Sequence, residues 1–452
     1  MVMHGVMVVW GEAYTSRFLE VFLPSLLSEG NLPALLEQFP CRFTVYTTPE
    51  DAGRMAASLA WSTLRSLVPV TFEALDAVPR DPLLDPVTLP GKFRTLAACH
   101  HHAMRGAAVD DAAMLLLGPD TLVSDGALHR VARLAGEGRR GLLLNHLSVT
   151  EDTFVPALER AFPADARGAR RVPPRDLTRT ALEHPHPWQE TLFLGDGPFQ
   201  VCSQMCWRVP GGGQVTHAWH LSPFFLHPQR LPARPFLTVD NDYTCQVIDD
   251  PATLQVPDDS DQVSFVELLP RRADRVTRPQ PYPFSPLRFA LGAEGLFPSP
   301  HGAHLVRQGI RWHGGEPGPR FAAVELRAQA VVAEVLAWMH RLEWPAGPGA
   351  LEPERRPEAM AMAETLRQDL RALDRPGARE RHPGQRCHLW ANLGKLEGLL
   401  GRVLAAREAL ERQLALGAGN PATAARVARR ARDLGLGALA ERAAGTVQPF
   451  PG

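Results

Sequence analysis

The chain has 452 residues, 45% hydrophobic and 21% charged, and its 48 basic and 49 acidic side chains leave a formal net charge of −1. The composition is that of a globular protein, and the length predicts two or three domains. A pI near 7.0 shows none of the excess of basic residues that is typical of nucleic-acid-binding domains. A mean hydropathy of −0.15 and the absence of an apolar run of about 18 residues argue against a membrane span.

The N-terminus and the cysteines favour a cytoplasmic protein. The first expected strand, Val6–Trp10, has no Lys or Arg before it and no small-residue cleavage site after it, so we expect no signal peptide. Cys202 and Cys206 have no second pair nearby, and the other four cysteines are isolated. This spacing favours reduced thiols over a zinc site.

Residues 1–150 alternate between expected strands and helices. Apolar runs predict strands at 6–10, 43–47, 68–72, 112–117 and 141–147. Helical spacing predicts helices at 14–27, 49–67, 92–108 and 125–134. We expect Pro24 to kink or end the first helix, and residues 47–51 to start the second, with a hydroxyl cap, a proline and early acids. The alternation predicts a mostly parallel sheet with helices on both faces, and a ligand crevice outside the carboxyl ends of its strands.

Residues 151–320 lose this rhythm. Short strand-like pieces at 199–209, 214–225, 236–239 and 263–269 are separated by proline-rich connections. We interpret them as a mixed α/β half that completes the same catalytic unit. The triplet Gly211–Gly213 predicts a hairpin turn rather than a phosphate-binding loop, because no helix follows it.

From about residue 320 the composition changes to Ala, Leu, Arg and Glu. A helix is expected at 321–342, followed by a Pro/Gly linker at 345–357. Four more helices are expected near 358–374, 388–399, 402–416 and 421–434. We therefore predict an α/β domain at 1–320, with a nucleotide half at 1–150 and an acceptor half at 151–320, then a helix and linker at 321–357 and a helical module at 358–452.

The α/β part resembles a nucleotide-sugar-dependent glycosyltransferase of the A-type fold over roughly residues 4–315. The resemblance is carried by Val8–Glu12, Leu23–Leu27 with Gly30–Pro33, Val45–Thr47 and, above all, Met114–Ser124. It implies a mostly parallel, Rossmann-like sheet and a metal-binding Asp-x-Asp after the fourth strand, where this chain has Gly118 and Asp120. No GxGxxG follows the first strand, which disfavours a dinucleotide-binding protein.

The tail resembles a tetratricopeptide repeat. Trp390, Leu393 and Gly394, then Ala406, Ala409 and Leu410, then Asn420–Pro421 follow the helix-turn-helix pattern of 34 residues. Glu397 stands where that pattern has a tyrosine. The alternative is a generic helical bundle, and either arrangement needs neighbouring helices to cover the repeat.

Asp120 is the main candidate for holding a divalent cation. It follows an apolar strand at the crevice side of the sheet, where a cation held by a carboxylate could stabilise a diphosphate leaving group. Mg²⁺ and Mn²⁺ need only one or two carboxylates, since they retain waters. The alternative is that Asp120 caps a turn.

Asp240 and Asp242 form a second acidic candidate after the run 236–239. In an extended segment they face the same way, so they could bind a metal or supply a general base for the acceptor hydroxyl. The alternative is an Asx turn. The acidic run 258–261 is interpreted as a solvated loop.

Three histidines, His217, His220 and His227, lie within eleven positions of the sequence. Imidazole binds Mn²⁺-like ions and titrates near neutral pH, so we expect His220 or His227 to join Asp120 as metal ligands. The run His100–His102 lies within a helix, where its side chains diverge.

The segment Ile310–Gly315 contains His313, which the resemblance identifies as a late histidine that could complete a metal or diphosphate site. Trp10, Gly11 and Glu12 end the first strand, and in this fold that loop lies beside the nucleotide base and ribose. A tryptophan face can stack on a base, although packing under the sheet edge would explain Trp10 equally well.

The leading interpretation is a metal-assisted glycosyltransferase that moves a sugar from a nucleotide-sugar donor to a hydroxyl of a glycan or protein. Its helical tail would bind a protein partner or the acceptor. Gly118 supports an alternative, a non-catalytic scaffold that keeps the nucleotide-sugar fold. A nucleotidyltransferase is a third interpretation, although only Arg17 lies close enough to the first strand to contact a triphosphate.

Overall fold

The computed structural model describes residues 1–79, 91–195, 199–201, 204–219, 221–232, 238–239, 243–271, 284–293, 303–343, 348–378 and 384–446. The chain divides into two compact units, one of residues 1–284 and 295–332 and the other of residues 285–294 and 333–452. The division falls inside helix α14 (Pro319–Glu343). Among the described helices, none is long and apolar enough to cross a membrane.

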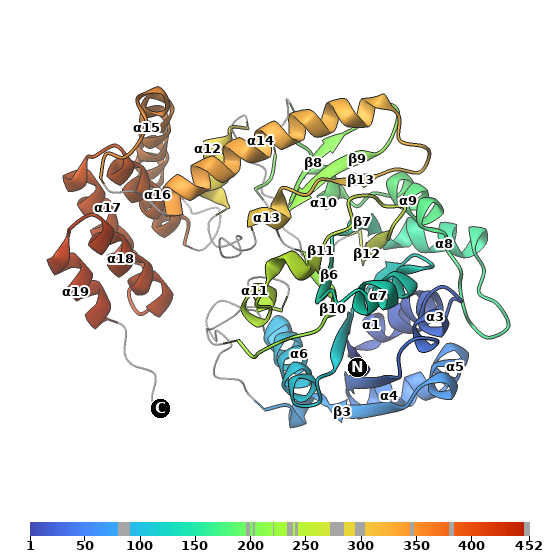
Figure 1. The fold of residues 1–452 in the computed structure, drawn as a ribbon. Coiled ribbons are helices and arrows are strands. Elements are labelled where there is room, and N and C mark those ends of the chain that lie inside the picture. The colour runs from blue at the N-terminus through green and yellow to red at the C-terminus, as the bar shows by residue number, and fades with distance from the viewer. Residues whose placement is uncertain are drawn as a thin grey trace. The chain divides into compact units, whose positions relative to one another are not determined.

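The first unit is built on a seven-stranded sheet of order β11-β6-β10-β4-β1-β2-β3 (Figure 1). Its strands are β1 (Met3–Val8), β2 (Cys41–Thr47), β3 (Val70–Ala74), β4 (Ala113–Leu117), β6 (Gly141–Leu144), β10 (Ser222–Leu226) and β11 (Leu254–Gln255). Only β10 runs antiparallel to its neighbours, β4 and β6, and the other pairs of this sheet are parallel. The prediction of a mostly parallel α/β sheet is thus confirmed.

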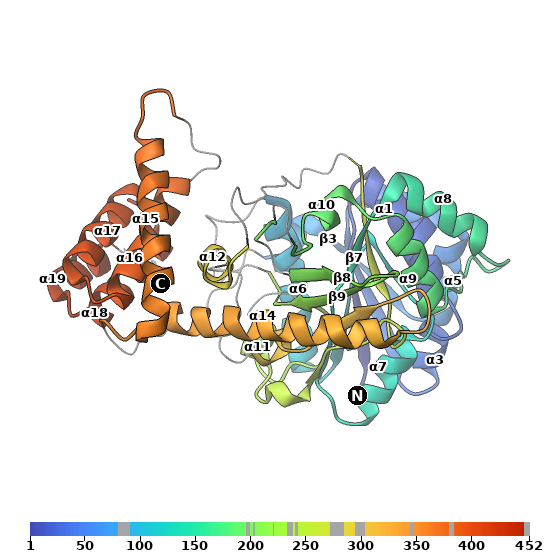
Figure 2. The same cartoon turned by 90° about the horizontal axis from the view of Figure 1, so that it is seen from above.

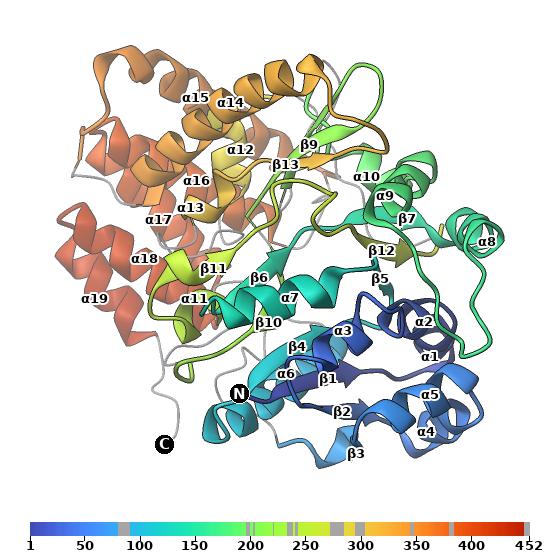
Figure 3. The same ribbon diagram turned by 45° about the vertical axis from the view of Figure 1, so that its right-hand side comes forward.

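Two smaller sheets extend this unit. One has the order β5-β12-β7 and the other β13-β9-β8. Their strands are β5 (Thr121–Val123), β7 (Leu147–Thr150), β8 (Gln204–Arg208), β9 (Gln214–Ala218), β12 (Phe265–Leu269) and β13 (Ile310–Trp312). In the view of Figure 3, β7, β12 and β5 lie between the β9–β13 strands and β1.

Helices cover both faces of the central sheet because its strands are apolar on both sides. Met3 and Met7 of β1 belong to one buried cluster with Phe22, while Val6 and Val8 belong to a second cluster with Met104 of the helix before β4. The helices up to β8 are α1 (Glu12–Arg17), η1 (Phe18–Phe22), α2 (Leu23–Leu26), α3 (Leu32–Leu36), α4 (Pro49–Ala56), α5 (Leu59–Leu67), η2 (Leu75–Ala77), α6 (Gly91–Val109), α7 (Ala127–Gly136), α8 (Glu151–Ala161), α9 (Pro174–Glu183) and α10 (Pro187–Glu190). Those that follow in this unit are α11 (Tyr243–Val247), η3 (Pro251–Thr253), α13 (Ala303–Val306) and the first part of α14.

Several predicted elements are divided in the structure. The expected helix 49–67 is two helices, because the Ser58 side chain caps α5 through the Trp61 N–H. The expected strand 141–147 becomes β6 and β7, and the piece 214–225 becomes β9 and β10, in each case in two different sheets. Pro24 follows a π-helical turn, Phe18–Phe22, in a helical segment that continues to Leu26. The expected strand 236–239 lies largely outside the described residues.

The second unit is helical, as predicted for the tail, and Figure 2 shows its helices from above. Its elements are α12 (Pro286–Gly292), η5 (Pro353–Arg355), α15 (Arg356–Leu373), α16 (Gln385–Leu399), α17 (Val403–Leu416), α18 (Pro421–Asp433) and α19 (Gly437–Gly445). A Cβ on Gly394 would lie 3.4 Å from Leu410 Cδ2 and 3.5 Å from Ala409 Cβ. The residues that carry the repeat resemblance therefore meet between α16 and α17. The sequence did not predict α19, whose Leu439 and Ala443 pack on Val427.

Glu397, the residue found in place of the repeat's tyrosine, is completely buried in α16. Its carboxylate is paired with Arg367 of α15, and Arg402 Nη1 lies 3.6 Å from Glu397 Oε2. A buried carboxylate is stable only when it is paired. The ion pair therefore joins α15 to α16 where the repeat pattern has an aromatic contact.

We expect Arg367→Met to destabilise the helical unit by about 2 kcal/mol, less than the ~3–5 kcal/mol for an isolated buried pair, because Arg402 stays near Glu397. Urea denaturation followed by circular dichroism measures the change. Arg371→Met, at an exposed arginine that pairs with Glu364, is the control and should change stability by less than about 0.5 kcal/mol. The double variant Arg367→Met/Glu397→Met should recover most of the loss, and a double variant as unstable as the single one would contradict this account.

Candidate functional site

The strand order creates a topological switch point between β1 and β4. The chain passes from β1 to β2 and β3 on one side and then returns to β4 on the other. In open α/β sheets, ligands bind in the crevice outside the carboxyl ends of the strands at such a point. Met7 of β1 pairs with Leu117 of β4. Trp10 lies three residues after Met7, and Asp120 lies three residues after Leu117. The structure thus brings the predicted Trp10–Glu12 loop and Asp120 to one edge of the sheet.

The loop after β1 is fixed by Asp51, a residue of α4. Gly11 has a φ of 82°, a conformation that favours glycine, and its N–H donates to Asp51 Oδ2 at 2.8 Å. The hydroxyls of Thr15 and Thr48 donate to the same carboxylate at 3.1 and 2.8 Å. Burial alone would raise the pKa of Asp51, but these hydrogen bonds and the charge of Arg54 hold it below its ordinary value.

The sequence predicted the start of α4 at this place, and the structure confirms Thr48 as the N-cap, with the Asp51 N–H bonded to Thr48 Oγ1 at 3.2 Å. It did not predict that Asp51 reaches the loop of the first strand. Glu12 is exposed, and Trp10 is half-buried and packs on one of the two cores. Trp10 therefore packs on the core and keeps part of its surface exposed.

Asp120 lies in a turn that is held by hydrogen bonds to its main-chain oxygens. Thr121 Oγ1 donates to Gly118 O at 2.8 Å, and Leu268 N–H donates to Asp120 O at 2.8 Å. A Cβ at Gly118 would lie 3.6 Å from Asp120 Oδ1 and 3.1 Å from Thr121 Cγ2. The Asp120 side chain thus lies beside the backbone of Gly118, next to the place where the side chain of an acidic residue at position 118 would begin.

Arg17 of α1 adds positive charge beside Asp120. It pairs with Glu151, with Nε 2.7 Å from Oε1 and Nη2 2.7 Å from Oε2. Burial by itself would lower the pKa of Arg17, but the Glu151 carboxylate and then the Asp120 charge raise it above its ordinary value. A guanidinium in this position stays charged, and its charge is shared between Glu151 and Asp120.

A second carboxylate, Glu267, lies next to this turn and was not among the predicted site residues. In β12, Glu267 is level with Thr121 of β5 on one side and Ser148 of β7 on the other. Ser148 Oγ donates to Glu267 Oε2 at 3.0 Å, and His146 Nε2 lies 3.2 Å from the same oxygen. The available signal was a single acid inside the apolar strand Phe265–Leu269.

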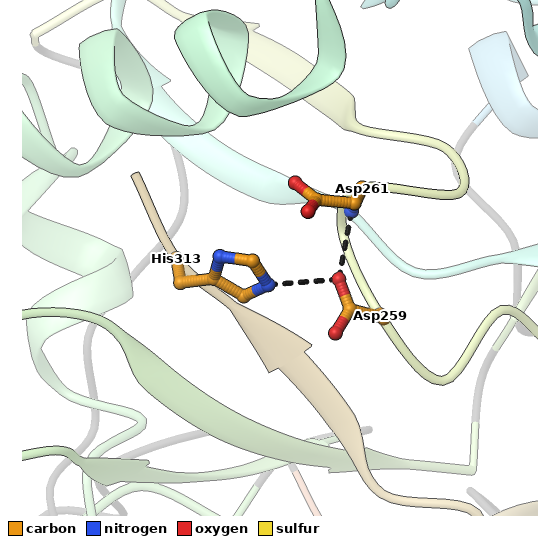
Figure 4. A group of neighbouring side chains, drawn as sticks. All are labelled: Asp259, Asp261 and His313. Carbon is orange, nitrogen blue, oxygen red and sulfur yellow. Dashed lines mark hydrogen bonds and ion pairs between the residues drawn. The ribbon is translucent and has the colours of Figure 1, made fainter. Parts of the chain in front are cut away.

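His313 lies with Asp259 and Asp261 (Figure 4). One ligand atom from each of the three residues lies within 4.8 Å of the others. Within the described parts of the chain, this is the only group of three or more His, Cys, Asp or Glu side chains close enough together to hold a metal ion. It does not include Asp120. Figure 4 shows the imidazole edge facing the Asp259 carboxylate.

The three side chains are also held by contacts within the protein. His313 Nδ1 is 2.5 Å from Gly315 O, and Nε2 is 2.8 Å from Asp259 Oδ1. A neutral imidazole donates through only one of its two nitrogens, so the tautomer decides which of these contacts is a hydrogen bond. Arg175 is paired with Asp261, so positive charge already compensates that carboxylate.

His227 does not join Asp120. It follows β10, which runs antiparallel to β4, and therefore lies at the opposite edge of the sheet. There its Nε2 is 3.0 Å from Asp111 Oδ1 and its Nδ1 is 2.6 Å from Arg140 Nη1. The predicted residues His220, Asp240 and Asp242 lie outside the described residues.

Three other histidines singled out in the sequence contact partners within the first unit. The buried His217 Nδ1 is 2.8 Å from Val306 O, and burial lowers the pKa of His217. His101 Nδ1 is 2.7 Å from Tyr243 Oη, and His102 Nδ1 is 2.9 Å from Tyr46 Oη. Two members of the run His100–His102 thus face different partners, as the helical geometry predicted.

No family model matches the chain, and no curated protein matches it at the threshold applied. Among solved structures it is similar to a protein assigned as a glucose-1-phosphate thymidylyltransferase from Bacillus anthracis, solved in complex with a sucrose. The two are 15% identical with a TM-score of 0.17, and the match covers 34% of this chain and 57% of that chain. A likeness this distant identifies neither a family nor a function.

Proposed function

We propose that the chain is a glycosyltransferase that moves a sugar from a nucleotide-sugar donor to a hydroxyl of a glycan or protein. The observation that carries the proposal is the meeting of the Trp10–Glu12 loop with Asp120 at the switch point between β1 and β4. Crevices at such points bind nucleotides in open α/β sheets. The resemblance of Val8–Glu12 and Met114–Ser124 to A-type glycosyltransferases supports the same assignment.

In this proposal the donor lies across the edge of the sheet. The base and ribose lie at Trp10, Gly11 and Glu12, and the diphosphate lies at Asp120. Mg²⁺ or Mn²⁺ fits Asp120 as a single protein carboxylate, because these ions accept phosphate oxygens and waters as their other ligands. When bound, the cation would neutralise the leaving diphosphate. Arg17, paired with Glu151, also interacts with the charge of Asp120.

Glu267 is the described carboxylate best placed to act as the general base. As the acceptor oxygen bonds to the anomeric carbon, the bond from that carbon to the diphosphate breaks and the hydroxyl proton passes to Glu267 Oε. Ser148 and His146, both at Oε2, would orient the carboxylate. Asp240 and Asp242 remain the residues predicted from the sequence for the same role.

The test is calorimetry with UDP, GDP, CDP, ADP and dTDP, each with and without Mn²⁺. We expect one nucleotide to bind, binding to strengthen with Mn²⁺, and Asp120→Asn to weaken it at least about tenfold, or 1.4 kcal/mol. The substitution keeps the shape of the side chain and removes the charge that holds the cation. Asp111→Asn makes the same change at an exposed residue of the opposite edge and should have no effect.

One observation favours a second candidate, a non-catalytic scaffold. Gly118 replaces the first acid of the expected pair, so one carboxylate remains at the turn. If no nucleotide binds, or if Asp120→Asn binds as well as the parent without any response to Mn²⁺, the scaffold becomes the better proposal. The helical unit would then supply the main function by binding a protein partner.

A further inference from the structure

A cavity of about 470 Å³ lies in the first unit, apart from the residues proposed to bind the donor. Its walls come from the start of β7, from α9 and α10, from the β8–β9 hairpin and from the segment His313–Phe321. The volume is within the range of roughly 300–1,000 Å³ that is typical of small-molecule sites. The cavity is therefore large enough for a ligand of one or two sugar rings.

The described arginines around this cavity are each paired with a carboxylate. Arg208 pairs with Glu190, and Arg175, next to the cavity, pairs with Glu316. Arg179 donates to Gly314 O at 3.0 and 2.8 Å and pairs with Asp176 at 2.8 Å. Glu183 adds an exposed carboxylate. Among the described residues, a phosphate or carboxylate ligand would find no uncompensated arginine at this cavity, whereas hydroxyl groups could both donate to and accept from these paired groups.

The wall opposite the helices is glycine backbone. Gly211, Gly212 and Gly213 have φ values of 97°, 116° and 91°, and they form the predicted hairpin turn between β8 and β9. A Cβ on Gly213 would lie 2.5 Å from Trp312 O and 2.7 Å from Phe321 Cζ, whereas a Cβ on Gly212 would meet nothing within 4 Å. The hairpin thus packs closely on one side and borders open space at Gly212.

The other walls are held in place. The Arg208 guanidinium lies 3.8 Å from the centre of the Phe193 ring, which makes a flat stacked surface. The His313 ring, in contact with Asp259 Oδ1 and Gly315 O, holds the segment that carries Gly315 and Glu316. A rigid wall with paired polar groups and an apolar ring suits a ligand that has hydroxyls on its edges and C–H groups on its faces.

Ser148 connects this cavity with the proposed base. It lines the cavity, and its hydroxyl donates to Glu267, which is level with Thr121, the residue after Asp120. The strands β7, β12 and β5 are neighbours, so β7 and β5 are about 10 Å apart at a spacing of ~4.8 Å per strand. Ser148 of the cavity wall thus lies about 10 Å across the small sheet from Thr121, the residue after Asp120.

We propose that this cavity binds the acceptor, and that the acceptor is an uncharged polyhydroxylated molecule, a neutral mono- or oligosaccharide. The inference rests on the proposed glycosyltransferase function. It adds the class of the acceptor and the residues that select it. Anionic sugars are disfavoured because the described arginines at the cavity are already paired and Glu183 adds a negative charge.

Saccharide binding without any nucleotide tests this proposal independently of donor binding. Ligand-observed NMR with the full chain would use glucose, galactose, mannose, maltose and lactose, against glucuronate and glucose 6-phosphate. We expect at least one neutral sugar to bind at least fivefold more tightly than its charged counterparts. Phe193→Leu, which removes the ring beneath Arg208, and Gly315→Leu, which adds a side chain where Cβ meets nothing within 4 Å, should each weaken that binding at least fivefold.

Phe72→Leu is the matched control. Phe72 is 41% exposed and stacks on Trp61, away from the cavity, so its variant should bind as the parent does. If no neutral sugar in the panel binds, or if the charged sugars bind more tightly, the acceptor proposal is overturned even where a nucleotide diphosphate binds at Asp120. Equal binding by both cavity variants and the parent, with their folds intact by circular dichroism, would overturn it as well.

Discussion

Glu267→Gln is expected to lower the rate of sugar transfer at least 100-fold and to leave nucleotide-diphosphate binding unchanged. A general base typically contributes about 10²–10⁴-fold to a rate. The amide of glutamine has the same shape as the carboxylate and keeps an oxygen for the Ser148 hydroxyl and a polar group for His146, but it cannot accept the proton of the acceptor. The loss should therefore appear in turnover, not in donor affinity.

The measurement is product formation from the donor and acceptor that the binding experiments identify. Glu137→Gln, the same change at an exposed carboxylate after α7 and outside the cavity lining, should retain most of the activity. A variant at Glu267 that turns over at the parental rate would remove it from the mechanism. If Asp242→Asn abolished turnover in the same assay, the residue predicted from the sequence would be the base instead.

Asp51→Ala is expected to lower the stability of the first unit by about 3 kcal/mol, since leaving a buried donor unsatisfied costs ~1–3 kcal/mol. Asp51 is 3% exposed and accepts hydrogen bonds from Gly11, Thr15 and Thr48. Alanine would remove the acceptor of all three hydrogen bonds at once and free the loop after β1. Nucleotide binding should weaken with stability, because the same loop is proposed to contact the base and ribose.

The contribution of Asp51 should also depend on pH. Its pKa is lower in the folded protein than the ordinary value of 3.8. A depressed carboxyl pKa stabilises the fold at pH values above the unfolded pKa, and this contribution is lost as the pH falls through the folded pKa. Between pH 7 and pH 3, Asp51→Asn should therefore lose less stability than the parent.

Denaturation by urea at several pH values measures both effects. Glu50→Ala, at the neighbouring and exposed residue of α4, is the control and should change stability by less than about 0.5 kcal/mol. An equally small change in Asp51→Ala would mean that the loop is held by other contacts. Parallel acid unfolding of Asp51→Asn and the parent would contradict the assignment of the pH dependence to this carboxyl.

Local sequence patterns determined most of the secondary structure. Apolar runs such as 112–117 predict buried strands whatever surrounds them, and Thr48–Pro49 begins a helix through contacts within its own first turn. The edge that brings Trp10 and Asp120 together could also be predicted, because in parallel βα units every carboxyl end lies at the same side. In the tail, the spacing of Gly394, Ala409 and Leu410 predicted which faces of two helices meet.

Strand direction and distant partners were decided only by the tertiary structure. The sequence of β10 carries no sign that it runs antiparallel, and that reversal moves His227 to the edge opposite Asp120. Glu267 reaches the turn of Asp120 through pairing across more than a hundred residues. His313 likewise meets Asp259 rather than a metal ligand at the donor edge. Periodicity reports which side of an element is apolar, but contacts between distant segments depend on how whole elements pack, and no local pattern encodes that packing.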